Sequence, residues 1–130
     1  MLQGETLREL GRNTEALAAF AQARDAASSE HEAALASCEM AGVHRLLSQV
    51  DAAWAALDAA APVAAKLHAA RWLSDIHYLR GNLHFARGDG AGCAREHQQA
   101  LALALQCGDA LAEAQALSGL KHEAARAQSL

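Results

Sequence analysis

The stretch Ala16-Leu-Ala-Ala-Phe20-Ala-Gln-Ala23 has a counterpart further along the chain, Val50-Asp-Ala-Ala-Trp54-Ala-Ala-Leu57. In both, a small residue, a large aromatic residue and a small or medium apolar residue follow one another at helical spacing. Pro62 stands eight residues after the second aromatic residue. Units of about 34 residues that recur in this way are helical hairpins, which bury their apolar faces by stacking on their neighbours. The spacing therefore predicts an all-α chain of antiparallel helical hairpins, stacked as a short α-solenoid.

Composition agrees with helix throughout. Alanine supplies 35 of the 130 residues and proline one, and alanine is the residue most favourable to helix.

The net charge of -4, without a stripe of lysine and arginine, argues against nucleic acid and anionic membrane as partners. The N-terminus lacks a signal-peptide pattern, and the three cysteines show no CxxC spacing, which favours reduced thiols and a cytoplasmic location.

Turn and capping signals divide the single predicted domain, residues 1–130, into units of about 1–28, 29–62, 63–107 and a partial unit 108–130. In the first unit we expect a turn at Gly11 between two helices. Ser29-x-x-Glu32 predicts a helix start. Pro62 predicts either a helix break or a place in the first turn of the following helix. A long helix is expected over 63–87, and helices after Gly88-Asp89 and Gly108-Asp109. The incomplete first and last units lead us to expect a piece of a longer array or ends covered by a second copy.

Gly4, Leu7, Gly11, Ala16, Phe20 and Ala23 follow the order of the tetratricopeptide repeat pattern, and the chain resembles that family. Residues 76–89, 96–101 and 116–120 more specifically resemble the C-terminal tetratricopeptide region of large bacterial signalling proteins. In those proteins a nucleotide cyclase or another effector is joined to an ATPase domain and then to helical repeats. The resemblance implies a protein-binding scaffold and brings no catalytic feature, since a GxxxxGK[ST] phosphate loop and paired metal-binding aspartates are lacking.

In this repeat family the first helix of each hairpin lines the concave, partner-binding surface. The resemblance assigns Glu32, Leu35 and Glu39 of the second unit to that surface. The third unit contributes the candidates Asp75, Tyr78, Asn82 and Phe85. Residues three and four apart share one helix face, and aromatic and amide side chains are frequent anchors of peptides. The alternative is that Tyr78 and Phe85 pack against the neighbouring hairpin.

Four residues of the third unit carry metal-ligating atoms: His77, His84, Cys93 and His97. Three imidazoles and a thiolate could form a tetrahedral zinc site, but their spacing matches no zinc signature, and we favour ordinary packing. We expect no metal and no cofactor.

The sequence thus predicts a non-catalytic interaction module within a larger ATP-dependent bacterial regulator. We expect its partner to be a protein or peptide, or another domain of the parent protein. The alternative is a structural unit that forms a homodimer through its terminal helices.

Overall fold

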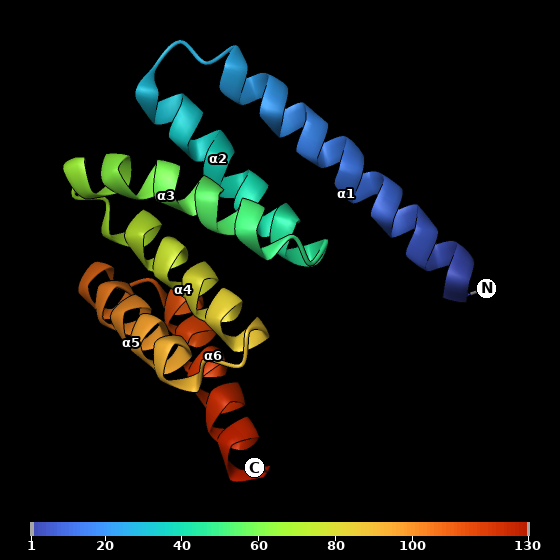
Figure 1. Ribbon diagram of the computed structural model, residues 1–130. Coiled ribbons are helices and arrows are strands. Elements are labelled where there is room, and N and C mark those ends of the chain that lie inside the picture. Colours follow the sequence, from blue (N-terminus) through green and yellow to red (C-terminus); the bar gives the residue numbers. More distant parts are fainter. Residues whose placement is uncertain (1, 130) are drawn as a thin grey trace. The chain divides into compact units, whose positions relative to one another are not determined.

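The computed structural model describes residues 2–129, and the side chains of residues 11–128, and within this part of the chain every regular element is a helix (Figure 1). The elements are α1 (Leu2–Asp25), α2 (Glu30–Leu46), α3 (Val50–Lys66), α4 (Ala70–Ala86), α5 (Gly90–Cys107) and α6 (Ala110–Ser129). The predicted all-α class is confirmed for these residues. None of these helices is long and apolar enough to cross a membrane.

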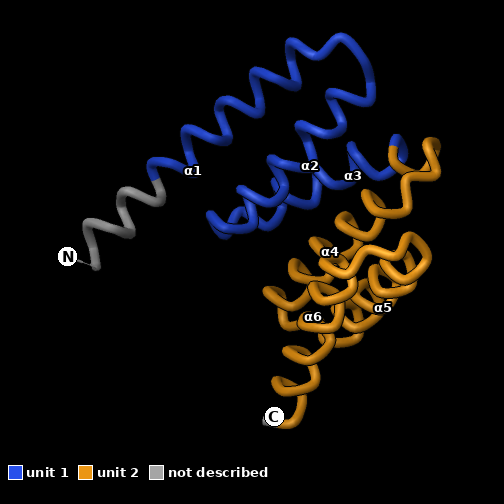
Figure 2. Tube along the Cα trace, turned by 180° about the vertical axis from the view of Figure 1, so that it is seen from behind, with its two compact units in different colours: residues 1–63 blue, residues 64–130 orange. Residues whose placement is uncertain are grey.

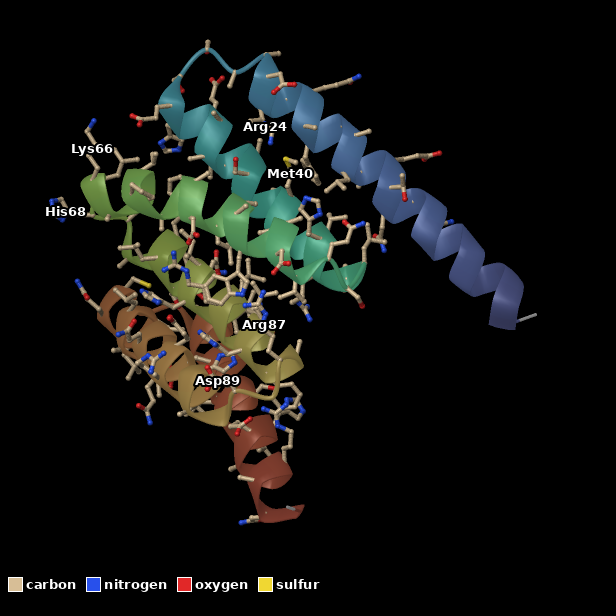
Figure 3. All side chains as sticks on the ribbon, in the orientation of Figure 1. Arg24, Met40, Lys66, His68, Arg87 and Asp89 are labelled. Atoms are coloured by element: carbon tan, nitrogen blue, oxygen red, sulfur yellow. The ribbon has the colours of Figure 1, made fainter. Side chains whose placement is uncertain are left out.

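The chain divides into two compact units, Met1–Val63 and Ala64–Leu130 (Figure 2). In the first unit α1 packs against α2, and Met40 of α2, which is buried, lies on the side that faces α1 (Figure 3). In the second unit α4, α5 and α6 all pack against one another. This three-helix unit carries the candidate site.

From α2 onward the helices are evenly spaced along the chain, since they begin at residues 30, 50, 70, 90 and 110. Each turn between them has one residue in the left-handed region, and these residues are Ser48, His68, Gly88 and Gly108. The residue after each of them donates its backbone N–H to a carbonyl five residues earlier, as in the bond from Asp89 to His84 at 2.9 Å. This is the Schellman ending of a helix, which satisfies carbonyls that would otherwise lack donors.

Capping side chains complete several helix starts. Asp89 and Asp109 accept hydrogen bonds from the backbone N–H groups of Gly92 and Ala112, each at 2.9 Å. These bonds lower the pKa of both carboxyl groups. Ser29 caps α2 as predicted, by accepting from the N–H of Glu32 at 3.1 Å.

The burial pattern of α3 recurs two helices later in α5, in what we call the two-helix register. When α3 and α5 are aligned by their first residues, Val50 and Gly90, their fully buried residues correspond: Ala53 with Cys93, Leu57 with His97, Ala60 with Ala100, and Ala64 with Ala104. This structural repeat is longer than the interval at which the sequence pattern recurs. Phe20 and Trp54, which hold equivalent positions in the repeated sequence pattern, are half-buried and do not correspond in this register.

Three predicted helix boundaries are wrong. α1 continues through Gly11 without a turn, and α3 continues through Pro62 to Lys66. The single long helix expected over 63–87 is instead interrupted at residues 67–69, where His68 takes a φ of 51°. The exposed side chain of His68 lies at this turn (Figure 3). A turn closed by histidine leaves no glycine or proline to mark it in the sequence.

Candidate partner-binding site

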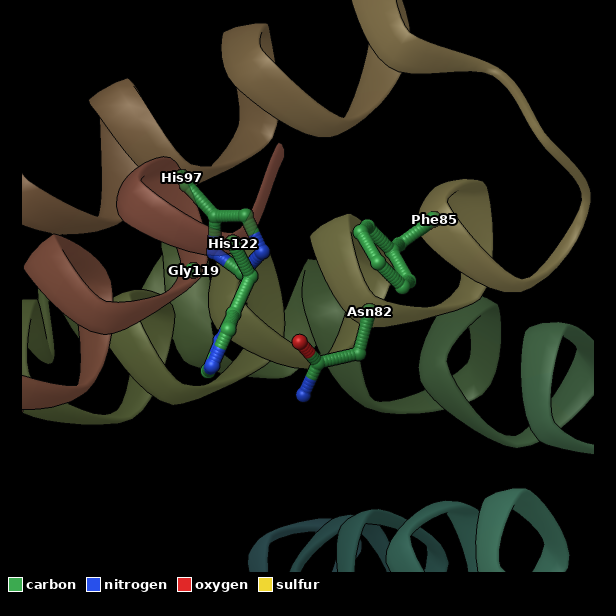
Figure 4. A pocket seen from close by; sticks show the side chains of 5 residues that line it. All are labelled: Asn82, Phe85, His97, Gly119 and His122. Carbon is green, nitrogen blue, oxygen red and sulfur yellow. The ribbon is translucent and has the colours of Figure 1, made fainter. Parts of the chain in front are cut away.

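The second unit contains a pocket of about 270 Å³. It is lined by residues of all three helices: Asn82 and Phe85 from α4, His97 from α5, and Gly119 and His122 from α6. Figure 4 shows the imidazole of His97 directed toward the space that Asn82 and Phe85 border on the opposite side. The pocket thus combines an aromatic wall with a few polar groups, which is the usual composition of a binding site.

Arg126 of α6 holds the aromatic wall in place. Its guanidinium lies over the ring of Phe85, 3.7 Å from the centroid, and donates to the backbone carbonyl of Phe85. The same guanidinium donates to the Glu123 carboxylate at 2.6 Å. A cation over an aromatic face is attracted by the ring quadrupole, so this contact fixes Phe85 and links α4 to α6.

His97 lies between two helical glycines. A Cβ atom added at Gly81 of α4 would stand 2.6 Å from Nε2 of His97, and one added at Gly119 of α6 would stand 2.4 Å from its Cε1. Real Cβ atoms do not approach so closely, because van der Waals contact between carbon atoms requires about 3.5–4.0 Å. The two glycines therefore make the room that the flat imidazole occupies.

The imidazole of His97 is buried and incompletely satisfied. The residue is only 1% exposed, and its Nδ1 atom has no hydrogen-bond partner among the described residues. Burial lowers the pKa of His97, although the nearby charge of Glu96 opposes the shift. The ring is therefore neutral at pH 7 and offers one donor and one acceptor. A buried polar group without a partner costs about 1–3 kcal/mol.

The residues predicted to bind a partner are not all brought together. Asn82 and Phe85 line the pocket, while the Tyr78 ring packs against His97 at a centroid distance of 5.6 Å. Asp75 instead pairs with Arg71, which also binds Asp109 at 2.7 Å.

The other three predicted residues, Glu32, Leu35 and Glu39, belong to the first unit. All are exposed on α2. They do not line the pocket, whose residues come from α4, α5 and α6. That they bind a partner stays a prediction.

Sequence reasoning did not assign His97, Gly119 and His122 to a binding site. A usable signal was present, because Gly81 and Gly119 stand inside helices. Glycine in a helix interior costs about 1 kcal/mol relative to alanine, so its presence there points to close packing.

The candidate zinc ligands are engaged separately. Nδ1 of His77 lies 2.6 Å from the Glu96 carboxylate, and Nδ1 of His84 lies 3.0 Å from the Asp89 carboxylate. Cys93 is buried, and burial raises the pKa of its thiol. Within the described residues, histidine, cysteine and carboxylate side chains do not gather in threes around a possible metal position.

Comparisons of the chain with protein-family models, with curated proteins and with solved structures give no match. The site must therefore be interpreted from its own geometry.

Proposed function

We propose that the chain is a non-catalytic helical-repeat module of the tetratricopeptide kind, in which the pocket on α4, α5 and α6 receives a protein or peptide partner. The observation that carries the proposal is the pocket itself, which Asn82 and Phe85 line together with the buried imidazole of His97. The two-helix register of burial supports the repeat class, with hairpins somewhat longer than the roughly 34 residues of the tetratricopeptide pattern.

The chemistry of the lining favours binding over catalysis. His97 is the one buried titratable group among the five residues that line the pocket, and the other four bring neither a hydroxyl or thiol nucleophile nor a carboxylate. A nucleophile, a base and an orienting group must converge for catalysis of the triad type. The net charge of -4 favours a neutral or basic protein segment over nucleic acid.

Selection from a displayed peptide library tests the proposal. Peptides enriched on the immobilised protein are measured by titration against the wild type and against the double variant Asn82→Ala/His122→Ala. We expect the double variant to lose at least tenfold in affinity, because it removes the amide and one imidazole from the pocket. Gln98→Ala, at an exposed position of α5, is the matched control and should bind as the wild type does. Enriched peptides that bind the double variant as tightly as they bind the wild type would contradict the proposal.

A second function is favoured by exposed leucines on α6. Leu111 is 63% exposed and Leu117 is 48% exposed, and both are large apolar side chains of the last helix that a second copy could cover. Homodimerisation through this helix is therefore our second proposal. Sedimentation equilibrium at micromolar concentration should show a dimer that Leu111→Glu/Leu117→Glu converts to a monomer.

We further propose that the module belongs to a larger ATP-dependent bacterial regulator, with another domain of that protein as a possible partner. This rests on the sequence resemblance of residues 75–120. The complete reading frame tests it, since an ATPase domain should be encoded in the same frame.

A further inference from the structure

The polar groups of the pocket limit what can occupy it. His97 lines the pocket although the residue is only 1% exposed, and its buried Nδ1 has no hydrogen-bond partner among the described residues. A hydrogen bond from an occupant therefore requires the edge of the imidazole to move into the pocket. Asn82, from the opposite wall, contributes a carboxamide that can both donate and accept. An occupant that offers a hydrogen-bonding group to the imidazole would therefore be favoured over one that is wholly apolar.

Charge further restricts the occupant to a neutral group. Burial disfavours the protonated imidazole of His97, so a carboxylate would not find a cationic partner in that ring. The nearby guanidinium of Arg126 is already bound to Glu123 and to the Phe85 carbonyl. A lysine or arginine side chain would find no carboxylate among the five residues that line the pocket.

Size and the aromatic wall favour a ring. A volume of about 270 Å³ exceeds what a hydroxymethyl or carboxamide group would fill. The Phe85 ring forms one wall of the pocket, and aromatic pairs prefer offset-stacked or edge-to-face contact. Among aromatic side chains, tryptophan has only a donor and phenylalanine has neither donor nor acceptor. The neutral ring of histidine has both, but it is smaller than a phenol and fills less of the volume beside Phe85. The phenol of tyrosine both donates and accepts, so it can pair with the imidazole in either tautomer.

We propose that the pocket receives a tyrosine side chain of the partner, with its ring against Phe85 and its hydroxyl hydrogen-bonded to the imidazole of His97. This deepens the proposed function and rests on it, because it names the residue by which a partner is held in the same pocket.

Two soluble probes that differ by one hydroxyl test the proposal. N-acetyl-tyrosinamide and N-acetyl-phenylalaninamide are titrated into the 15N-labelled protein while amide and imidazole signals are followed by NMR. We expect the tyrosine probe to shift the signals of Gly119, of the Asn82 side chain and of the His97 ring in a saturable way. Its Kd should be at least tenfold lower than that of the phenylalanine probe.

Variants of the lining residues test whether the imidazole of His97 recognises the hydroxyl group of the tyrosine probe. His97→Phe keeps a flat ring between the glycines and should reduce the preference for tyrosine to less than twofold. Asn82→Ala alters the rim without touching the glycine-lined space, should leave the circular dichroism spectrum unchanged, and should weaken the tyrosine probe severalfold. Gln98→Ala should change neither affinity.

Equal affinity of the two probes for the wild type would overturn the proposal, as would equal or stronger binding of N-acetyl-tryptophanamide, or shifts confined to residues outside the pocket. These outcomes are separable from failure of the proposed function. Library peptides without tyrosine that still require Asn82 and His122 would refute the tyrosine but retain the binding module.

Discussion

The close approach of helices around His97 gives a sharp prediction about two glycines. Gly81→Ala would place a Cβ atom 2.6 Å from Nε2 and 2.7 Å from both Cδ2 and Cε1 of His97. Each contact is about 1 Å shorter than van der Waals distance. The ring cannot withdraw, because on its other face a Cβ at Gly119 would stand 2.4 Å away. The substitution must therefore displace a helix or force the imidazole out of its place.

Gly42→Ala supplies the matched control. Gly42 is also in a helix interior, but a Cβ added there meets nothing within 4 Å. It should gain the helix propensity of alanine over glycine, about 0.8–1.0 kcal/mol. Gly81→Ala gains the same amount but incurs overpacking, which typically costs about 1–3 kcal/mol and occasionally more. With contact on both faces we take the upper end of that range, and expect a net loss of about 2 kcal/mol.

Urea unfolding followed by circular dichroism measures the two free energies, which should differ by about 3 kcal/mol. The double variant Gly81→Ala/His97→Leu should recover part of the loss. It recreates the pair Ala41 and Leu57, both buried, which occupies the equivalent positions one repeat earlier. If Gly81→Ala proved as stabilising as Gly42→Ala, the placement of His97 between α4 and α6 would be refuted.

Three further predictions concern the turns, the buried imidazole and metal binding. Ser48→Gly and His68→Gly should each stabilise the fold by about 1 kcal/mol, because a non-glycine residue in the left-handed region costs roughly 1–2 kcal/mol. The two residues have φ values of 60° and 51°. Thermal melting measures the change, and a fall in Tm would contradict the prediction. Burial lowers the pKa of His97 in the folded chain below its usual value of 6.5. The unfolded chain therefore binds more protons than the folded chain at pH values below about 6.5. The free energy of unfolding should then fall as the pH drops below this value. Urea midpoints from pH 8 to pH 5 should show this slope, and His97→Leu should reduce it; an unchanged slope would mean that His97 does not contribute. Equimolar zinc should leave Tm unchanged, because His77 and His84 are held by separate carboxylates; a rise reversed by chelator would show binding to the folded state.

The all-α fold could be predicted because its signals are local. Ser29 and Glu32 mark the start of α2, and Gly88-Asp89 and Gly108-Asp109 mark the turns that flank α5. In each case the side chain that signals the boundary also makes the capping bond. Such information is contained within a few residues, so sequence reasoning can recover it.

The wrong helix boundaries lie at residues whose type is compatible with more than one backbone conformation. Pro62 stands in the later part of α3 and is exposed, so its missing N–H costs one hydrogen bond without ending the helix. The turn at His68 is closed by a residue that only infrequently adopts the left-handed region. The pattern shared by residues 16–23 and 50–57 recurs at a shorter interval than the burial pattern shared by α3 and α5.

The candidate site could be predicted only in part, because its halves come from different helices. Asn82 and Phe85 share a helix face, which spacing reveals, but the entry of His97 from α5 and of Gly119 from α6 depends on packing. Interior glycines hint at such packing without identifying the partner residue.

The two-helix register shows in what respect His97 differs from the residue at the equivalent position. At the equivalent position the first unit buries Leu57, and where the second unit has Gly81 the first has Ala41. An apolar pair therefore satisfies the packing demands of this register at lower cost than an imidazole whose Nδ1 lacks a partner among the described residues. Positions that break a local packing pattern are expected at functional sites. A histidine at the position of the leucine, with a glycine at the position of the alanine, therefore agrees with our proposal that the pocket receives an occupant.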